Sequence, residues 1–397
     1  MKNEVIKYAK EIEGELIGFR HKIHSYAEVG FDLPKTTKLV SEAISAMGGS
    51  TKRLGRCGLI AELGQGKCPT VLLRADMDAL KIRERTGLPF AAKNGNMHAC
   101  GHDIHTSMLL GAFYILSKLQ DKIRGRIKFV FQPAEETLEG CADMIEGGLL
   151  DEKIDMALAI HVLSGTELPC GTFIVPEGGV SAPSSTFFKI TVRGTSAHGG
   201  MHTDGRDALA CAARILQSIE ELPCREFNSK DPVAVTVGTF NGGNAPNVIA
   251  DLCELCGTAR ATSRETGKRL FLRITELSSG IARLYGCRAK AEILSFCPPL
   301  VNDGTCSERI AKYARELFGN DRVLSSAAAR GASGGSEDFA FIAERVPSCA
   351  VAISAGSIAE GHSAPLHNPE TILSDDSIRH GAAYLAFSAL RYFDEMR

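Results

Sequence analysis

Residues 70–80, TVLLRADMDAL, begin with a run of apolar side chains and end on acidic ones. A short continuous apolar run predicts a strand that is buried on both faces of a sheet. Two later runs have the same form: RIKFVFQPAEE at 126–136, where we expect the strand to end at Pro133, and DMALAIHV at 155–162. Between the first two lies HDIHTSMLLGAFYILSKL at 102–119, whose apolar residues recur at helical spacing. Alternating strands and helices predict an α/β domain with a mostly parallel central sheet.

The predicted strands end on side chains that can carry charge or bind a metal. These side chains lie near Asp76, near Glu135 and at His161. Functional sites of open α/β sheets lie at the carboxyl ends of the strands. We therefore expect these three segments to border one site.

A different pattern runs from about Thr186 to about Ser295. It predicts a strand, a helix, two strands, a helix and a strand, at 185–194, 204–222, 232–240, 251–262, 264–285 and 287–296. That order is the split βαβ, ferredoxin-like arrangement. Strand–helix alternation then resumes, in segments at 305–317, 323–328, 337–345, 348–355 and 375–392 that would complete the sheet of the first domain. We therefore predict a discontinuous first domain, 1–182 and 296–397, and an inserted α+β domain at 183–295.

Size and charge narrow the class of protein. A chain of 397 residues exceeds one ordinary core, which also favours two domains. Its formal net charge of −2 argues against nucleic acid or an anionic membrane as a partner. No apolar run reaches the length of a bilayer span. The charged N-terminus, MKNEVIKYAK, does not resemble a secretory signal, so we interpret the thirteen scattered cysteines as reduced thiols of a cytoplasmic protein.

The densest chemical signal is MHACGHDIHT at 97–106. Four side chains that can bind a metal lie within eight residues, just before a predicted helix, and they are His98, Cys100, His102 and His105. Thiolate and imidazole groups are good ligands for Zn²⁺ and similar divalent ions. Any one of the histidines alone could simply cap or pack the helix. The cluster as a whole predicts a metal site.

Three further motifs offer compatible ligands. FQPAEE at 131–136 presents two adjacent carboxylates, which are tolerated together when one binds a metal and the other transfers protons. Exposed turns are the more common setting for such pairs. IHV at 160–162 fits a core histidine equally well, and PLHNP at 365–369 fits a surface turn. Together the four motifs supply three histidines, one cysteine and one glutamate, enough for two metals if a thiolate bridges them.

In order and separation, these motifs resemble a family of metal-dependent amidohydrolases that includes aminoacylase, glutamate carboxypeptidase and succinyl-diaminopimelate desuccinylase. The match is strongest to the branch of hippurate hydrolases and indole-acetyl-amino-acid hydrolases, and it runs from about His24 to His380. It implies a zinc-peptidase-like catalytic domain interrupted by a lid domain through which the chain forms a homodimer.

The resemblance also implies roles for particular residues. Glu135 corresponds to the general base and acid, and Asp78 to a carboxylate that orients the site. Two divalent ions (zinc, manganese or cobalt) would be bound, with a cysteine bridging them, by Cys100, His102, Glu136, His161 and His367.

Three residues of the lid domain resemble the family's substrate contacts. His198 corresponds to a histidine that stabilises the oxyanion, either within its own subunit or across a dimer. Asn247 and Arg260 correspond to contacts of the substrate carboxylate, although a turn residue and a surface charge are the ordinary interpretations of the two. The chain departs from the branch at 199–202, where Gly-Gly-Met-His replaces Ala-Ala-x-Pro-His, so no role is carried over to His202.

The resulting hypothesis is a metal-dependent amidohydrolase that cleaves small N-acyl or N-aroyl amino acids into a carboxylic acid and a free amino acid. The alternative within the same fold is a dipeptidase or carboxypeptidase, including a p-aminobenzoyl-glutamate hydrolase. A free substrate amine would need an acidic anchor, which no motif clearly offers. The identity of the acyl group and of the amino acid depends on pocket walls that the motifs do not contain.

Overall fold

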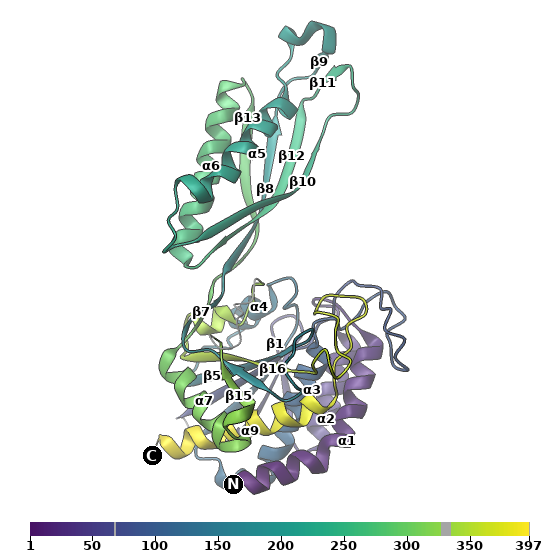
Figure 1. Cartoon of the computed structure of the whole chain (residues 1–397), viewed down its shortest axis with the longest axis vertical. Coiled ribbons are helices and arrows are strands. Elements are labelled where there is room, and N and C mark those ends of the chain that lie inside the picture. The colour runs from purple at the N-terminus through teal and green to yellow at the C-terminus, as the bar shows by residue number, and fades with distance from the viewer. Residues whose placement is uncertain (67–68, 327–334, 397) are drawn as a thin grey trace. The chain divides into compact units, whose positions relative to one another are not determined.

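A computed structural model describes residues 1–66, 69–326 and 335–396. The chain divides into two compact units, coloured along the sequence in Figure 1. Apart from residues outside the described ranges, the larger unit comprises 1–181, 301–332 and 341–397, and the smaller unit comprises 182–300 and 333–340.

The larger unit is built on an eight-stranded sheet. Its strands lie in the order β1 (Thr51–Leu54), β2 (Gly58–Gly64), β4 (Arg126–Gln132), β3 (Thr70–Asp76), β5 (Met156–Leu163), β16 (Ser348–Ser354), β6 (Phe173–Val175) and β15 (Val323–Ser325). The central pairings β4–β3, β3–β5 and β5–β16 are parallel, as is β6–β15. The pairings β1–β2, β2–β4 and β16–β6 are antiparallel. The sheet is therefore mixed, with the predicted parallel arrangement at its centre.

Helices complete the hydrophobic core of this unit. α3 (His102–Lys118) and α9 (Asp376–Glu395) pack against each other and the sheet, and α1 (Lys2–Tyr26) packs against both helices. All residues of β3 are buried, as are fourteen residues of α3, because each element is covered on every side. The remaining helical segments are α2 (Pro34–Ala46), η1 (Gln120–Lys122), α4 (Gly140–Glu146), α7 (Gly304–Phe318), η3 (Asn320–Arg322) and α8 (Ala340–Ala343). A separate pair joins β7 (Gly179–Ala182) to β14 (Leu300–Asn302).

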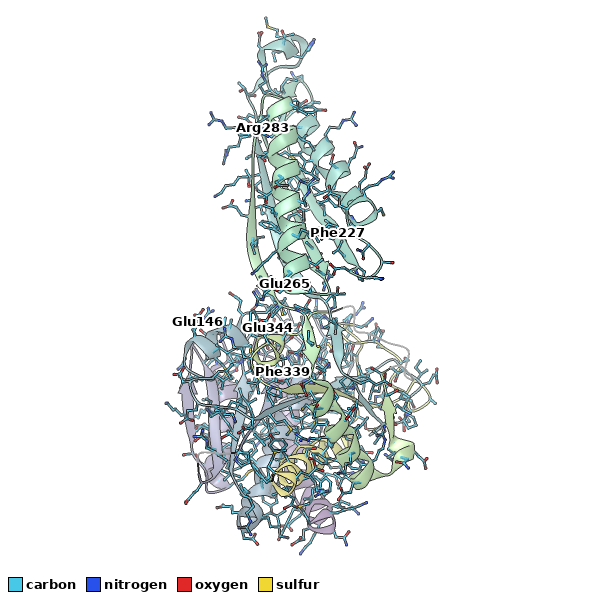
Figure 2. All side chains as sticks on the ribbon, turned by 90° about the vertical axis from the view of Figure 1, so that its left-hand side faces the viewer. Glu146, Phe227, Glu265, Arg283, Phe339 and Glu344 are labelled. Atoms are coloured by element: carbon cyan, nitrogen blue, oxygen red, sulfur yellow. The ribbon has the colours of Figure 1, made fainter. Side chains whose placement is uncertain are left out.

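The smaller unit has the expected ferredoxin-like arrangement. Its sheet runs in the order β10 (Val233–Gly242), β12 (Leu252–Ala261), β8 (Ser184–Arg193) and β13 (Arg288–Cys297), with every pairing antiparallel. α5 (Ala208–Arg225) and α6 (Arg264–Leu284) pack on the sheet and bury a second apolar core. Figure 2 labels Glu265 and Arg283 at the two ends of α6. A small two-stranded sheet joins β9 (Ala197–His198) to β11 (Val248–Ile249), and η2 (Gly199–Asp204) follows β9.

Among the described residues, no helix is both long enough and apolar enough to cross a membrane.

Candidate metal centre

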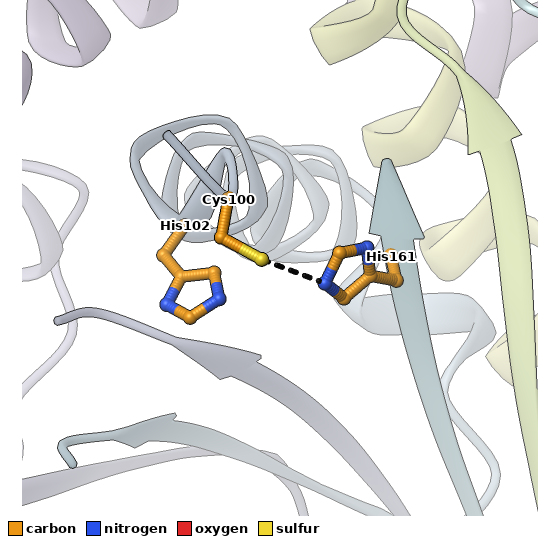
Figure 3. A group of neighbouring side chains, drawn as sticks. All are labelled: Cys100, His102 and His161. Atoms are coloured by element: carbon orange, nitrogen blue, oxygen red, sulfur yellow. Dashed lines mark hydrogen bonds between the residues drawn. The ribbon is translucent and has the colours of Figure 1, made fainter. Parts of the chain in front are cut away.

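The loop before α3 brings two candidate ligands together. Gly101 lies between Cys100 and His102 with a φ of 83°, a left-handed conformation that favours glycine. A Cβ atom there would lie 2.4 Å from Cγ2 of Val162. Glycine is therefore required on both backbone and packing grounds. Figure 3 shows the result, in which the Cys100 thiol and the His102 ring approach His161 of β5.

Cys100 belongs to two groups of potential ligands. Its sulfur, a ring nitrogen of His102 and a ring nitrogen of His161 lie within 4.8 Å of one another. The same limit holds for Cys100, Glu136 and His367. The Cys100 Sγ lies 3.4 Å from Nε2 of His161 and 3.2 Å from Nε2 of His367. One sulfur thus faces two adjacent sets of donors.

His161 is held in the form that binds metals. Its Nδ1 lies 2.7 Å from the carbonyl oxygen of Val162, so Nδ1–H donates there and the lone pair of Nε2 faces Cys100. Burial lowers the pKa of His161 to about 3. The ring is therefore neutral across the physiological range, as a metal ligand must be.

The two adjacent carboxylates follow the end of β4 in a tight turn. Ala134 adopts a φ of 52°, an uncommon conformation for a residue with a side chain. The carboxylate of Asp78 accepts the backbone N–H groups of Glu135, at 2.9 Å, and of Glu136, at 3.3 Å. A Cβ atom on Gly140 would lie 1.6 Å from the carbonyl oxygen of Pro133. The conformation of Ala134, the hydrogen bonds to Asp78 and the close packing at Gly140 therefore all fix the turn that carries the two carboxylates.

His102 lies at the centre of this acidic group. Its Nδ1 is 3.5 Å from Oδ1 of Asp78, and its Nε2 is 3.9 Å from Oε2 of Glu135 and 3.8 Å from Oε1 of Glu136. Both ring nitrogens are buried, yet within the described part of the chain neither has a hydrogen-bond partner. Buried polar atoms are normally bonded, so this arrangement indicates a missing partner.

Charge in the site also favours a cation. Burial, together with the nearby carboxylates of Asp78 and Asp76, raises the pKa of Glu136 to about 7, although His102 opposes the shift. Burial likewise raises the pKa of the Cys100 thiol. A divalent ion would stabilise the charged forms of both groups. The donor set of thiolate, imidazole and carboxylate therefore fits such an ion.

His367 reaches the site from a distant segment. Its backbone N–H donates to the carbonyl oxygen of Ala99 at 2.9 Å, and its φ is 63°. Strained backbone of this kind is concentrated at functional sites. Its side chain is 53% exposed, against 11% for Glu136, so the centre opens to solvent on this side.

The sequence did not indicate two polar networks behind the candidate ligands. In one, Arg74 and His105 both contact Asp76. In the other, Asp103 accepts hydrogen bonds from Arg20 and His24 of α1. The only signal in the sequence was that His105 and Asp103 belong to the same short cluster, 97–106, as the candidate ligands Cys100 and His102.

The three candidates of the smaller unit divide between two places. The exposed His198 lies opposite Val248 in the β9–β11 pair, and the backbone carbonyl oxygen of Asn247 accepts the N–H of Gly199 at 2.7 Å, so these two candidates are neighbours. Arg260 lies near the far end of β12 and donates to Oγ of Ser336 at 3.0 Å. A ten-residue strand spans roughly 30 Å. Arg260 is therefore remote from His198 and Asn247 within the unit.

Comparison with known proteins gives a consistent answer. Over 388 residues the chain is 32% identical to the IAA-amino acid hydrolase ILR1-like 4 of Arabidopsis thaliana, covering 96% of this chain and 86% of the relative. It is 33% identical to the hippurate hydrolase of Campylobacter jejuni, covering 96% and 97%. A Bacillus subtilis structure, described as a dinuclear metal-binding peptidase of the M20 family, superposes with a TM-score of 0.80 at 28% identity, covering 97% and 99%.

The fold and the site define a metal-binding hydrolase of the amidohydrolase and metallopeptidase class. The model of peptidase family M20/M25/M40 matches residues 72–391. The chain belongs to that family.

Proposed function

We propose that this chain hydrolyses the amide bond of N-acyl or N-aroyl amino acids and releases a carboxylic acid and a free amino acid. The observation that carries the proposal is the convergence of four donor side chains (His102, Glu136, His161 and His367) on Cys100, with the carboxylate of Glu135 beside them. The relatives support the substrate class, because two of them are named as hydrolases of amino acid conjugates.

Two divalent ions, zinc, manganese or cobalt, would be held by the side chains of Cys100, His102, Glu136, His161 and His367. When bound, such ions make water nucleophilic at neutral pH and polarise the substrate carbonyl group. Soft thiolate and imidazole donors are compatible with each of these metals, so availability decides among them.

Glu135 is the proposed general base and acid. Its carboxylate lies on the same turn as Glu136 and is almost buried, with 8% of the side chain exposed. It takes a proton from the attacking water and delivers that proton to the nitrogen of the departing amine, so the peptide C–N bond breaks without releasing an amide anion. Asp78 holds the Glu135 turn by its backbone N–H, which fixes the base.

The prediction for Glu135→Gln is a protein that keeps its metal and loses turnover. Glutamine keeps the size of the side chain but cannot accept the proton, so we expect kcat to fall by about 10²–10⁴-fold or more. Hydrolysis of N-benzoylglycine and N-acetyl amino acids, measured beside plain dipeptides and p-aminobenzoyl-glutamate, checks both the base and the substrate class. Glu139→Gln, on the same segment, is the matched control. Full activity of Glu135→Gln would contradict the role, and a preference for plain dipeptides would contradict the substrate.

We further propose that the chain acts as a homodimer through the smaller unit. β13 is an edge strand of the sheet, and it exposes Ile293 (49%) and Leu294 (60%), while the adjacent α6 exposes Leu272 (55%). An exposed apolar edge strand can pair with a second chain. A second copy of this chain would cover that surface on both partners.

The dimer would account for the separation of the substrate contacts. His198 and Asn247 are remote from Arg260 along β12, so one smaller unit cannot bring all three to one small substrate. We propose that Arg260 binds the substrate carboxylate and that His198 and Asn247 reach the same substrate from the partner subunit. His198 would then stabilise the oxyanion of the tetrahedral intermediate.

Mixing two inactive variants tests this arrangement. The Glu135→Ala variant lacks the proposed base, and the His198→Ala variant lacks the proposed oxyanion contact. If His198 acts across the dimer, refolded mixtures should regain about a quarter of wild-type activity, because half the dimers are mixed and one of their two sites is complete. No recovery, in mixtures shown by mass spectrometry to contain the mixed dimer, would contradict action across the dimer.

We also propose a cytoplasmic location. Two pairs of neighbouring cysteines, Cys211 with Cys287 and Cys306 with Cys349, are free thiols, as expected in a reducing compartment.

A further inference from the structure

His105 is the third histidine of the 97–106 cluster, and both of its ring nitrogens are engaged. Its Nε2 accepts the backbone N–H of Val162 at 2.8 Å, so this nitrogen carries no proton. Its Nδ1 therefore carries the ring proton, and Nδ1–H donates a hydrogen bond to Oδ1 of Asp76 at 2.6 Å. The side chain is 1% exposed. His105 has no lone pair left for a metal ion, although it lies close enough to Asp76 and His102 to form a potential ligand group.

The Val162 peptide links His105 to a proposed ligand. Val162 gives its N–H to His105, and its carbonyl oxygen accepts Nδ1–H of His161 at 2.7 Å. The pairing of β3 with β5 ends at Arg74 and Ala159, so His105 binds β5 beyond the last rung of that ladder. The rings of His105 and His161 also meet edge to face, with centroids 4.6 Å apart. His105 thus fixes the Val162 peptide, to which His161 donates, and packs against the His161 ring. Both contacts orient His161.

Buried charge fixes the other side of His105. Oδ2 of Asp76 lies 2.7 Å from Nη1 of Arg74, and Nε of Arg74 donates to Oε1 of Gln132 at 2.9 Å. All three side chains are buried, at the ends of the neighbouring strands β3 and β4. The buried carboxylate of Asp76 therefore bonds to both Arg74 and His105. With these two partners it stays ionised and keeps one orientation.

We propose that Arg74, Asp76 and His105 form a positioning relay, in which His105 fixes His161 for metal binding without binding metal itself. This inference rests on the proposed function only in taking His161 as a metal ligand. Groups behind metal ligands typically change metal affinity by 10–100-fold when they are removed.

Three substitutions separate the two hydrogen bonds of His105. His105→Ala removes both bonds. His105→Gln can place an acceptor near the former Nε2, facing Val162, whereas His105→Asn can replace only the bond to Asp76. Because the bond to Val162 is the one that acts on His161, we expect Co²⁺ affinity to follow the order wild type, Gln, Asn, Ala, with Ala about 10–100-fold weaker than wild type.

The experiment titrates metal-free protein with Co²⁺, by calorimetry and by the thiolate-to-cobalt absorption band. Ser107→Ala is the matched control, since Ser107 is a buried residue of the same helix whose hydroxyl donates to the carbonyl oxygen of Asp103, within α3 itself. Circular dichroism and melting of the metal-free variants show whether each one folds. The result that supports the relay is the same number of bound Co²⁺ ions per chain in wild type and all three His105 variants, with affinities in the expected order.

Equal affinities and spectra for wild type and His105→Ala would overturn the relay alone. Loss of one metal equivalent in Ala, Asn and Gln alike would also overturn it, because His105 would then be a ligand. A wild-type protein that takes up no cobalt would overturn the proposed function together with this inference.

Discussion

Asp78 shows how one carboxylate can organise several parts of a site. Its two oxygens accept the backbone N–H groups of Glu135 and Glu136, and one of them also lies 3.5 Å from the ring of His102. The proposed base, Glu135, and two proposed ligands, Glu136 and His102, are therefore all positioned by the side chain of Asp78.

Replacing Asp78 should consequently affect metal binding and catalysis together. In Asp78→Ala both N–H groups of the turn lose their acceptor, so we expect metal affinity and kcat/KM each to fall by about 10–100-fold. Metal analysis after gel filtration and steady-state kinetics on N-benzoylglycine measure the two effects. Asp78→Asn, which keeps one acceptor oxygen, should lie between Ala and wild type. An Ala variant with normal metal content and normal kinetics would refute this account of Asp78.

Residue by residue, the sequence could identify the cluster but not assign every role within it. Cys100, His102 and His105 look alike as potential ligands in 97–106. What distinguishes His105 is the N–H of Val162, more than fifty residues away, which occupies its lone pair. Such a partner depends on how α3 lies against β5, and no local pattern contains that information. The left-handed backbone conformations of Ala134 and His367 could not be predicted from the sequence for the same reason.

At the scale of elements, a buried charge network ties α1 to the start of α3. Arg20 and His24 of α1 both contact Asp103, and His24 also lies 3.2 Å from Glu84. Burial alone would lower the pKa of His24, but hydrogen bonds to Asp103 and Glu84 outweigh burial and raise this pKa to about 9. His24 is therefore protonated at neutral pH, and it anchors the helix that carries His102.

This network predicts a loss of stability in alkaline solution. Because the pKa of His24 is raised on folding from 6.5 to about 9, its contribution is complete below pH 6.5 and is lost as the pH rises through 9. The full contribution is about 3 kcal/mol. Melting temperatures from pH 6 to 10 should fall more steeply for wild type than for His24→Gln. Parallel curves for the two proteins would show that His24 does not titrate in this way.

Most elements could be predicted, with errors at their ends that have physical causes. The strand expected to end at Pro133 ends one residue earlier, at Gln132, because Pro133 cannot continue the ladder and Ala134 turns the chain. The helix expected from Asp204 begins at Ala208, where the side chain of Asp207 caps the N–H groups of Leu209 and Ala210. The strand expected at 323–328 is described as β15 as far as Ser325, and its last two residues lie outside the described ranges.

At the scale of the molecule, the proposed ligands come from four separate segments of the larger unit. A bound metal would link the loop before α3, the turn after β4, the end of β5 and the loop that carries His367. Ligands that bind only the folded state stabilise it, by about 4 kcal/mol at a concentration a thousand times the dissociation constant. The smaller unit contains none of these residues.

Chelation should therefore abolish activity and lower the melting temperature of the larger unit, while leaving the smaller unit unchanged. Differential scanning calorimetry, with and without a chelator, measures this difference, and hydrogen exchange assigns each transition to its unit. Readdition of Mn²⁺, Zn²⁺ or Co²⁺ should restore both properties. A chelated protein that keeps its activity would contradict metal dependence.

The most direct test of the metal centre is a crystal structure of cobalt-loaded protein, with anomalous diffraction collected at the cobalt absorption edge. We expect two anomalous peaks, both within bonding distance of the Cys100 sulfur, with His102, Glu136, His161 and His367 completing the ligand set and Glu135 beside them. Peaks bound by His105 and Asp76, or no ordered peak near Cys100, would contradict the assignment of this site.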